Sequence, residues 1–63
     1  MLGYEIKLYC AETGKLNLSA KQCYFSDFAA IRAALGIARA TESLEIWRDE
    51  KCIYRIRRSE VRT

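Results

Sequence analysis

The sequence contains no histidine and no proline, and its 63 residues include only three glycines and three cysteines. Without histidine, a cysteine or serine nucleophile has no imidazole base, and zinc lacks a nitrogen ligand that it commonly takes. The cysteines are odd in number and form no C-x-x-C pair, so the sequence indicates neither a disulfide framework nor a zinc site. We therefore predict that the protein is not an enzyme and holds no metal or cofactor, with Cys10, Cys23 and Cys52 as reduced thiols.

Long apolar runs are missing as well. No stretch approaches the roughly 18 apolar residues of a membrane span, and the first seven residues lack the basic and apolar pattern of a signal peptide. We expect a cytoplasmic protein with no membrane partner. No linker, repeat or low-complexity segment interrupts residues 1–63, which should form one small domain. A chain this short buries only about 60% of its unfolded surface, so a partner subunit is expected to add stability.

The positive charge lies in the second half of the chain. The formal net charge is +3; basic and acidic residues balance in residues 1–31, whereas residues 32–63 carry eight Lys or Arg against five acids. This distribution predicts a basic C-terminal strand and tail. The last twelve residues contain four arginines and one acid, which are Arg55, Arg57, Arg58, Arg62 and Glu60.

Apolar and polar residues alternate from Tyr4 to Cys10, which is typical of a strand with one buried face. Gly14 predicts a three-residue hairpin loop over residues 12–14, because the third loop position is left-handed and suits glycine. This loop sets the register of the first hairpin. One face pairs Cys10 with Leu16, Leu8 with Leu18 and Ile6 with Ala20, and the other pairs Tyr9 with Asn17, Lys7 with Ser19 and Glu5 with Lys21.

A helix is predicted from Phe28 to Ala40, with Ser26 as its N-cap and Asp27 placed to complement the helix dipole. An apolar arc of about half the circumference is expected to face the sheet. Beside this arc lie Ala29 and Ala33, and the scarcity of polar surface favours a second contact along this alanine side, although simple exposure to water is an alternative. The members of the arc are Phe28, Ala30, Ile31, Ala34, Leu35, Ile37 and Ala38.

The last hairpin is expected between Ser43 and Arg58. A two-residue turn at Asp49-Glu50 would mix polar and apolar residues on both faces, so a three-residue loop over residues 49–51 is favoured. This loop requires a left-handed Lys51. It pairs Ile46 with Tyr54 and Leu44 with Ile56 on the inner face, and Glu45 with Arg55 and Trp47 with Ile53 on the outer face.

These elements predict an α+β fold of β-β-α-β-β order, in which one helix packs on one face of a four-stranded antiparallel sheet. A right-handed crossover over the first strand places the second strand at one edge, followed by the first, third and fourth strands.

The outer face of this sheet is the candidate site. Trp47 and Ile53 are expected there beside Tyr9, and the surrounding basic residues are Lys7, Lys21, Arg55 and Arg57. Trp47 could anchor a homodimer or another protein partner, stack on nucleic-acid bases together with Tyr9, or only shield Ile53. The aromatic signature of RNA-recognition motifs is missing, which favours the protein interface.

The segments 44–48 (LEIWR) and 52–56 (CIYRI) follow an alanine-rich helix and a Tyr-x-Ile-x-Leu strand. In this arrangement the chain resembles small uncharacterised bacterial ββαββ proteins that end in an "LEIW-R…V-x-R-I" hairpin. The resemblance covers most of the chain and implies the same fold, but it implies no activity. We predict a non-enzymatic binding module that forms a homodimer, with nucleic-acid binding and the phage-type inhibition of a larger protein machine as alternatives.

Overall fold

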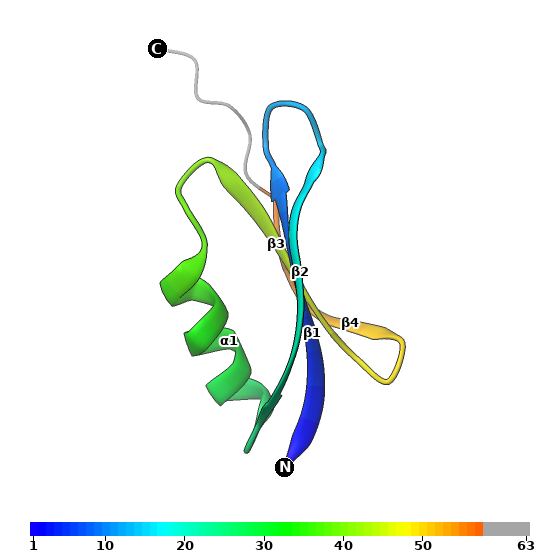
Figure 1. Cartoon of the computed structure of the whole chain (residues 1–63). Helices are drawn as coiled ribbons and strands as arrows, with labels where there is room; N and C mark the ends of the chain where they lie inside the picture. The colour runs from blue at the N-terminus through cyan, green and yellow to red at the C-terminus, as the bar shows by residue number, and fades with distance from the viewer. Residues whose placement is uncertain (58–63) are drawn as a thin grey trace.

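The computed structural model describes residues 1–57 of the chain. It contains strands β1 (Leu2–Cys10) and β2 (Leu16–Tyr24), helix α1 (Asp27–Ile37), and strands β3 (Glu42–Arg48) and β4 (Lys51–Ile56). The strands form one antiparallel sheet in the order β2-β1-β3-β4 (Figure 1). The predicted α+β class and strand order are confirmed. The predicted basic tail lies in part outside the described residues, because Arg58 and Arg62 belong to residues 58–63.

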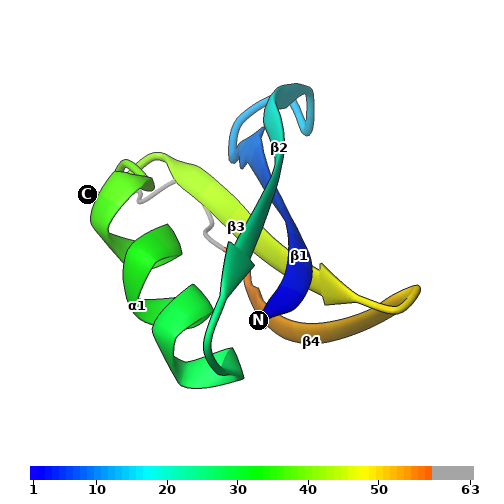
Figure 2. The same ribbon diagram turned by 60° about the horizontal axis from the view of Figure 1, so that its bottom comes forward.

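Helix α1 covers one face of the sheet, here called the inner face, and leaves the outer face uncovered (Figures 1 and 2). The only helix residues that are buried are Ala30 and Ala34. Because an alanine side chain ends at Cβ, the helix adds little side-chain volume to the core, and the core is thin. The buried core consists of Tyr4, Ile6, Leu8, Ala30, Ala34, Leu44 and Ile46.

The start of the helix agrees with the prediction, but its end does not. The Ser26 side chain accepts a hydrogen bond of 3.2 Å from the Ala29 N–H, as an N-cap residue should. The helix ends at Ile37, before the predicted end at Ala40. Its C-cap, Ala38, has extended backbone angles while its N–H still donates to the Ala34 carbonyl.

The predicted apolar arc is right at its centre and too wide at its edges. Ala30 and Ala34 are buried, and Ile31 and Ala38 pack against the core, as predicted. Phe28, Leu35 and Ile37 were expected to face the sheet, yet they are 67%, 41% and 53% exposed. The buried line runs through Ala30 and Ala34 on successive turns, near the middle of the predicted arc. The arc is narrower than predicted, because only the residues next to this line reach the core.

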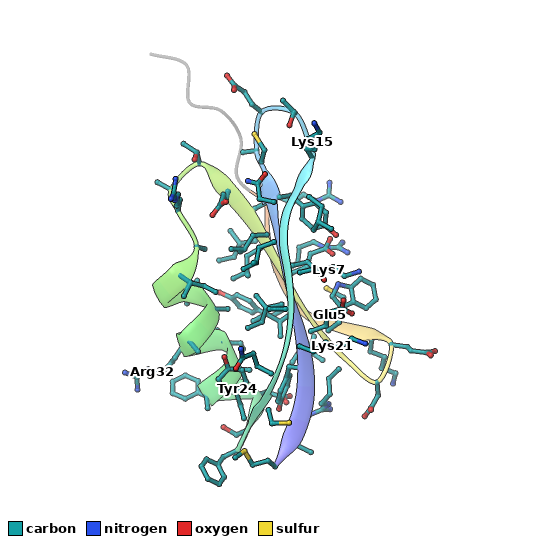
Figure 3. The ribbon with its side chains drawn as sticks, in the orientation of Figure 1. Glu5, Lys7, Lys15, Lys21, Tyr24 and Arg32 are labelled. Atoms are coloured by element: carbon teal, nitrogen blue, oxygen red, sulfur yellow. The ribbon has the colours of Figure 1, made fainter. Side chains whose placement is uncertain are left out.

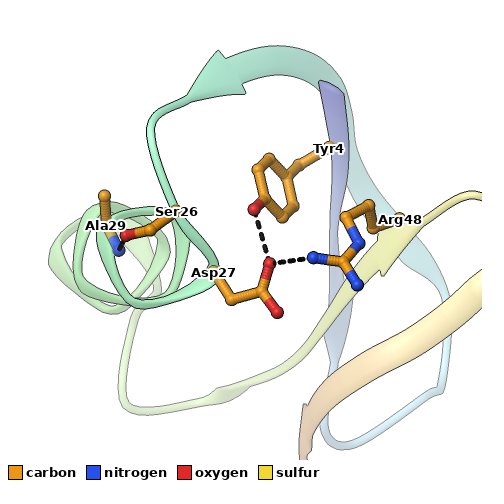
Figure 4. A network of polar contacts seen from close by, with 5 residues as sticks. All are labelled: Tyr4, Ser26, Asp27, Ala29 and Arg48. Atoms are coloured by element: carbon orange, nitrogen blue, oxygen red, sulfur yellow. Dashed lines mark hydrogen bonds and ion pairs between the residues drawn. The ribbon is translucent and has the colours of Figure 1, made fainter. Parts of the chain in front are cut away.

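Asp27 fixes how the helix is turned. Its Oδ1 accepts a hydrogen bond of 2.5 Å from the Tyr4 hydroxyl of β1, and it forms an ion pair of 2.5 Å with Nη1 of Arg48 at the end of β3 (Figure 4). Desolvation, reinforced by the hydrogen bond to Asp27, raises the pKa of Tyr4. The first turn of α1 is thus tied to the two central strands.

The first hairpin keeps most of the predicted register. Glu5 pairs with Lys21, Ile6 with Ala20, Lys7 with Ser19 and Leu8 with Leu18, as expected. The predicted pairs of Tyr9 with Asn17 and Cys10 with Leu16 are wrong, because the register shifts after Leu8 and Tyr9 pairs with Leu16. The extra residue in β2 is a β-bulge.

The loop of this hairpin explains the bulge. Gly14 is left-handed with φ 76°, as predicted. However, the Cys10 N–H donates to the Lys15 carbonyl and the Gly14 N–H donates to the Cys10 carbonyl. The closing pair is therefore Cys10 with Lys15, and residues 11–14 form a longer loop than the three residues expected. The bulge absorbs the difference in length.

The second hairpin corrects the predicted loop. Asp49 and Glu50 both have positive φ, at 52° and 65°, so they form the two-residue turn that the sequence pattern disfavoured. Lys51 begins β4 and is not left-handed. A register shift after Ile46 restores the predicted pairs farther along, which are Leu44 with Ile56, Glu45 with Arg55 and Ile46 with Tyr54.

The same shift displaces one candidate site residue. Trp47 pairs with Cys52 and not with Ile53. Ile53 is partly buried and packs against the hydrophobic core. The prediction that Ile53 stands opposite Trp47 on the outer face is therefore wrong, because the bulge gives this part of β4 one residue more than its partner strand.

The turn at Asp49-Glu50 yields a test of the local backbone. We expect Glu50→Gly to stabilise the protein by about 1 kcal/mol, because glycine adopts positive φ without the Cβ clash of other residues. Lys51→Gly is the matched control and should destabilise, since Lys51 lies in a strand. Urea unfolding followed by Trp47 fluorescence measures both. Stabilisation by Lys51→Gly and not by Glu50→Gly would contradict the two-residue turn.

Candidate interaction site

A single carboxylate organises the centre of the outer face. Glu45 Oε1 accepts hydrogen bonds from the indole N–H of Trp47 at 2.9 Å and from the Tyr9 hydroxyl at 3.3 Å. Its other oxygen, Oε2, lies 3.2 Å from Nε of Arg55. The carboxylate comes from β3 and reaches side chains of β1 and β4, so it joins three strands. We call Glu45, Trp47, Tyr9 and Arg55 the Glu45 cluster.

Trp47 is further covered by a basic side chain. Lys7 Nζ lies 5.3 Å from the centre of the Trp47 ring, within the range of a cation–π contact. Lys7 is opposite Glu45 in the β1–β3 ladder, and Glu5 is opposite Trp47. Figure 3 shows Glu5, Lys7 and Lys21 on the side of the sheet away from the helix. Trp47 is half-buried by these contacts within the chain.

The electrostatic surroundings of the cluster affect Tyr9. Burial is the main cause that raises the pKa of Tyr9, followed by the charge of Glu45 and the hydrogen bond to it. The hydroxyl of Tyr9 therefore stays protonated as a donor. The indole N–H of Trp47, the Tyr9 hydroxyl and Nε of Arg55 all contact the Glu45 carboxylate, so these groups are paired within the chain.

The structure brings together only part of the predicted site. Trp47, Tyr9, Lys7 and Arg55 lie in or on the Glu45 cluster, and Lys21 stands opposite Glu5 on β2. Arg57 is exposed just after the end of β4. Ile53 packs against the core, and Ala29 and Ala33 are half-buried on the helix, which covers the other face.

The sequence did not identify which large apolar side chains stay exposed. Within residues 1–57, several large hydrophobic side chains are at least 40% exposed, and most of them come from β2, α1 and the residues between these elements. The 51% hydrophobic composition predicts that one helix on one sheet leaves apolar groups uncovered, but it does not say which ones. They are Met1, Leu2, Leu16, Leu18, Phe25, Phe28, Leu35 and Ile37.

The described residues offer little for catalysis or metal binding. Hydrogen bonds from Thr13, first from its side chain, lower the pKa of the Cys10 thiol, but the chain has no histidine to activate it further. A hollow beside Trp47 is lined by charged side chains of both signs, which are positive lysines and negative carboxylates. Within residues 1–57, no group of three metal-ligating His, Cys, Asp or Glu side chains is found, and the helix is too short to cross a membrane.

No family model, curated protein or solved structure matches the chain. The resemblance to small bacterial ββαββ proteins therefore stays a prediction.

The Glu45 cluster predicts a measurable loss of stability. Glu45→Ala should lower the free energy of unfolding by about 2 kcal/mol, because it leaves the half-buried indole N–H of Trp47 without its acceptor and removes a charge-assisted contact with Arg55. Glu12→Ala, at an exposed turn position, is the control and should change stability by less than about 0.5 kcal/mol. Equal effects of the two substitutions in urea unfolding would show that the cluster is not a structural centre.

Proposed function

We propose that this chain is a non-catalytic binding module that works as a homodimer. The observation that carries the proposal is the set of large apolar side chains left exposed at the edge strand β2 and at the end of α1, which are Leu16, Leu18 and Ile37. Burying such side chains against a partner stabilises by roughly 25 cal/mol per Å² of apolar surface. A second copy would therefore supply stability that the thin core lacks.

The outer face supports the proposal less than the sequence suggested. An anchor residue gains most when it enters a partner pocket with its polar groups newly paired. The Trp47 indole already donates to Glu45, and Lys7 lies over its ring. We therefore place the contact on the side of β2 and α1, not around Trp47.

Nucleic-acid binding is the alternative, and two contacts weigh against it. Stacking needs an open aromatic face, whereas Lys7 already lies over Trp47. Phosphate binding needs unpaired cations, whereas Arg55 is paired with Glu45. A heterologous protein, such as a larger machine that the module inhibits, would bind the same exposed apolar side chains as a second copy.

We further propose that the protein acts in the cytoplasm. Cys10, Cys23 and Cys52 are all free thiols in the structure, and Cys23 is exposed. An exposed thiol keeps its reduced form most readily in a reducing compartment, which supports this assignment.

Light scattering over a concentration series tests the proposed function. The mass should rise to a plateau at twice the 7.3 kDa of one chain. A mixed-sequence oligonucleotide added at low salt should leave that mass unchanged, and a gain that disappears with added salt would favour the nucleic-acid alternative. A mass that stays at 7.3 kDa at high micromolar concentration would refute the homodimer.

A further inference from the structure

We infer that a second copy pairs with the first along the free edge of β2, antiparallel and about a two-fold axis at Ala20. The inference deepens the proposed function, because it names the surface of the homodimer. It joins the two sheets into one continuous sheet, with both helices on the same face.

The edge of β2 is long enough for this pairing. The strand has nine residues and is last in the sheet order. Such a strand spans about 30 Å and presents unpaired backbone groups, which proteins normally cover or blunt. The bulge that interrupts it lies near its start and leaves residues 18–24 regular.

The hydrogen bonds of the first hairpin show which backbone groups point outward. The Cys10 N–H donates across the hairpin to the Lys15 carbonyl, whereas the Ala11 N–H donates to Thr41, which precedes β3. Because this direction alternates along an antiparallel strand, Leu8 and Ile6 face β2 with their backbone groups. Their partners in β2 are Leu18 and Ala20. The residues between these partners, Ser19 and Lys21, therefore direct their N–H and C=O groups away from the sheet.

The position of the two-fold axis follows from the charge of Lys21 and from the length of β2 that the two copies pair. With the axis at Ala20, Ser19 of each copy exchanges hydrogen bonds with Lys21 of the other, and the whole strand overlaps. With the axis at Lys21, two ammonium groups would stand directly opposite each other, which is destabilising. The axis at Ala20 keeps the lysines apart, so it is the register that we assign.

The helix presents small side chains to this edge. Asp27 contacts Arg48 of β3, so Ile31 and Leu35, which follow it at helical spacing, lie on the flank toward β3. Ala29, Ala33 and Ile37 repeat at the same spacing on the opposite flank, toward β2. In the dimer this alanine flank faces the helix of the second copy.

The proposed dimer would bury exposed apolar residues of β2 and α1 in one interface. Leu18 pairs with Leu8, a core residue, so it belongs to the inner face, yet it is exposed at the edge of the sheet. Ile37 is exposed on the flank of α1 toward β2. Pairing at the edge of β2 puts the second copy against both side chains. The dimer interface would then contain two contacts, the pairing of the two β2 strands and, beside it, the contact along Ala29 and Ala33 that the sequence suggested.

Disulfide trapping tests the register. In a background with Cys10, Cys23 and Cys52 replaced by serine, Ala20→Cys should form a covalent dimer on mild oxidation. The reason is that directly opposed residues that are not hydrogen-bonded have Cα atoms about 4.5 Å apart. Lys21→Cys is the matched control and should not cross-link, because its counterpart lies diagonally across the pair. Cross-linking of Lys21→Cys alone, or of neither variant in a protein that light scattering shows to be a dimer, overturns the inference and leaves the homodimer standing.

A second pair of variants tests the edge without cysteine chemistry. Ser19→Pro removes an outward N–H, which an edge strand tolerates, and should give a folded monomer. Ser19→Ala loses the same hydroxyl, which donates to Glu5 at 2.9 Å, but keeps the N–H, and should stay a dimer. Circular dichroism checks the fold and light scattering the mass. A folded Ser19→Pro variant that still dimerises contradicts the edge pairing, and a wild-type monomer refutes both this inference and the proposed function.

Discussion

The contact of two alanines with the sheet is the constraint on which the rest of the structure depends. Ala30 and Ala34 are fully buried, and around them α1 contacts β2 and β3 while it adds only two small side chains to the buried core. Large apolar side chains of the helix are therefore forced to its flanks. The molecule gains a close-packed centre, but it leaves apolar surface on both sides of the helix that a single chain does not cover.

Two carboxylates then fix the polar contacts on the two faces of the sheet. Asp27 joins Tyr4 and Arg48 and so determines which flank of the helix faces β3. Glu45 joins Trp47, Tyr9 and Arg55 and so satisfies the polar groups of the outer face. Each network uses the donors around it within the chain. The apolar side of β2 and α1 is left as the surface with most to gain from a partner.

Patterns of local origin were predictable from the sequence. Alternation located the strands, Ser26 marked the start of the helix, and the crossover rule gave the strand order. The two bulges were not predictable, because each depends on how many residues the neighbouring turn leaves outside the hydrogen-bonded strand pair. One of them moved Ile53 from the outer face to the core. Trp47, Tyr9, Lys7 and Arg55 were predicted on the outer face, and the register predicted Glu45 opposite Arg55. The hydrogen bonds from Trp47 and Tyr9 to Glu45 were not predictable, because they depend on side-chain conformations. The helix arc was too wide because periodicity ranks residues by polarity and ignores the depth available to each.

The central claim is that the outward backbone groups of β2 are paired in a dimer. Amide hydrogen exchange followed by NMR over a range of protein concentrations tests it most directly. The amide of Ala20, bonded within the sheet, should be protected at every concentration. The amides of Ser19 and Lys21 should gain protection only as the protein associates. Fast exchange of Ser19 and Lys21 at concentrations where light scattering detects the dimer would contradict it.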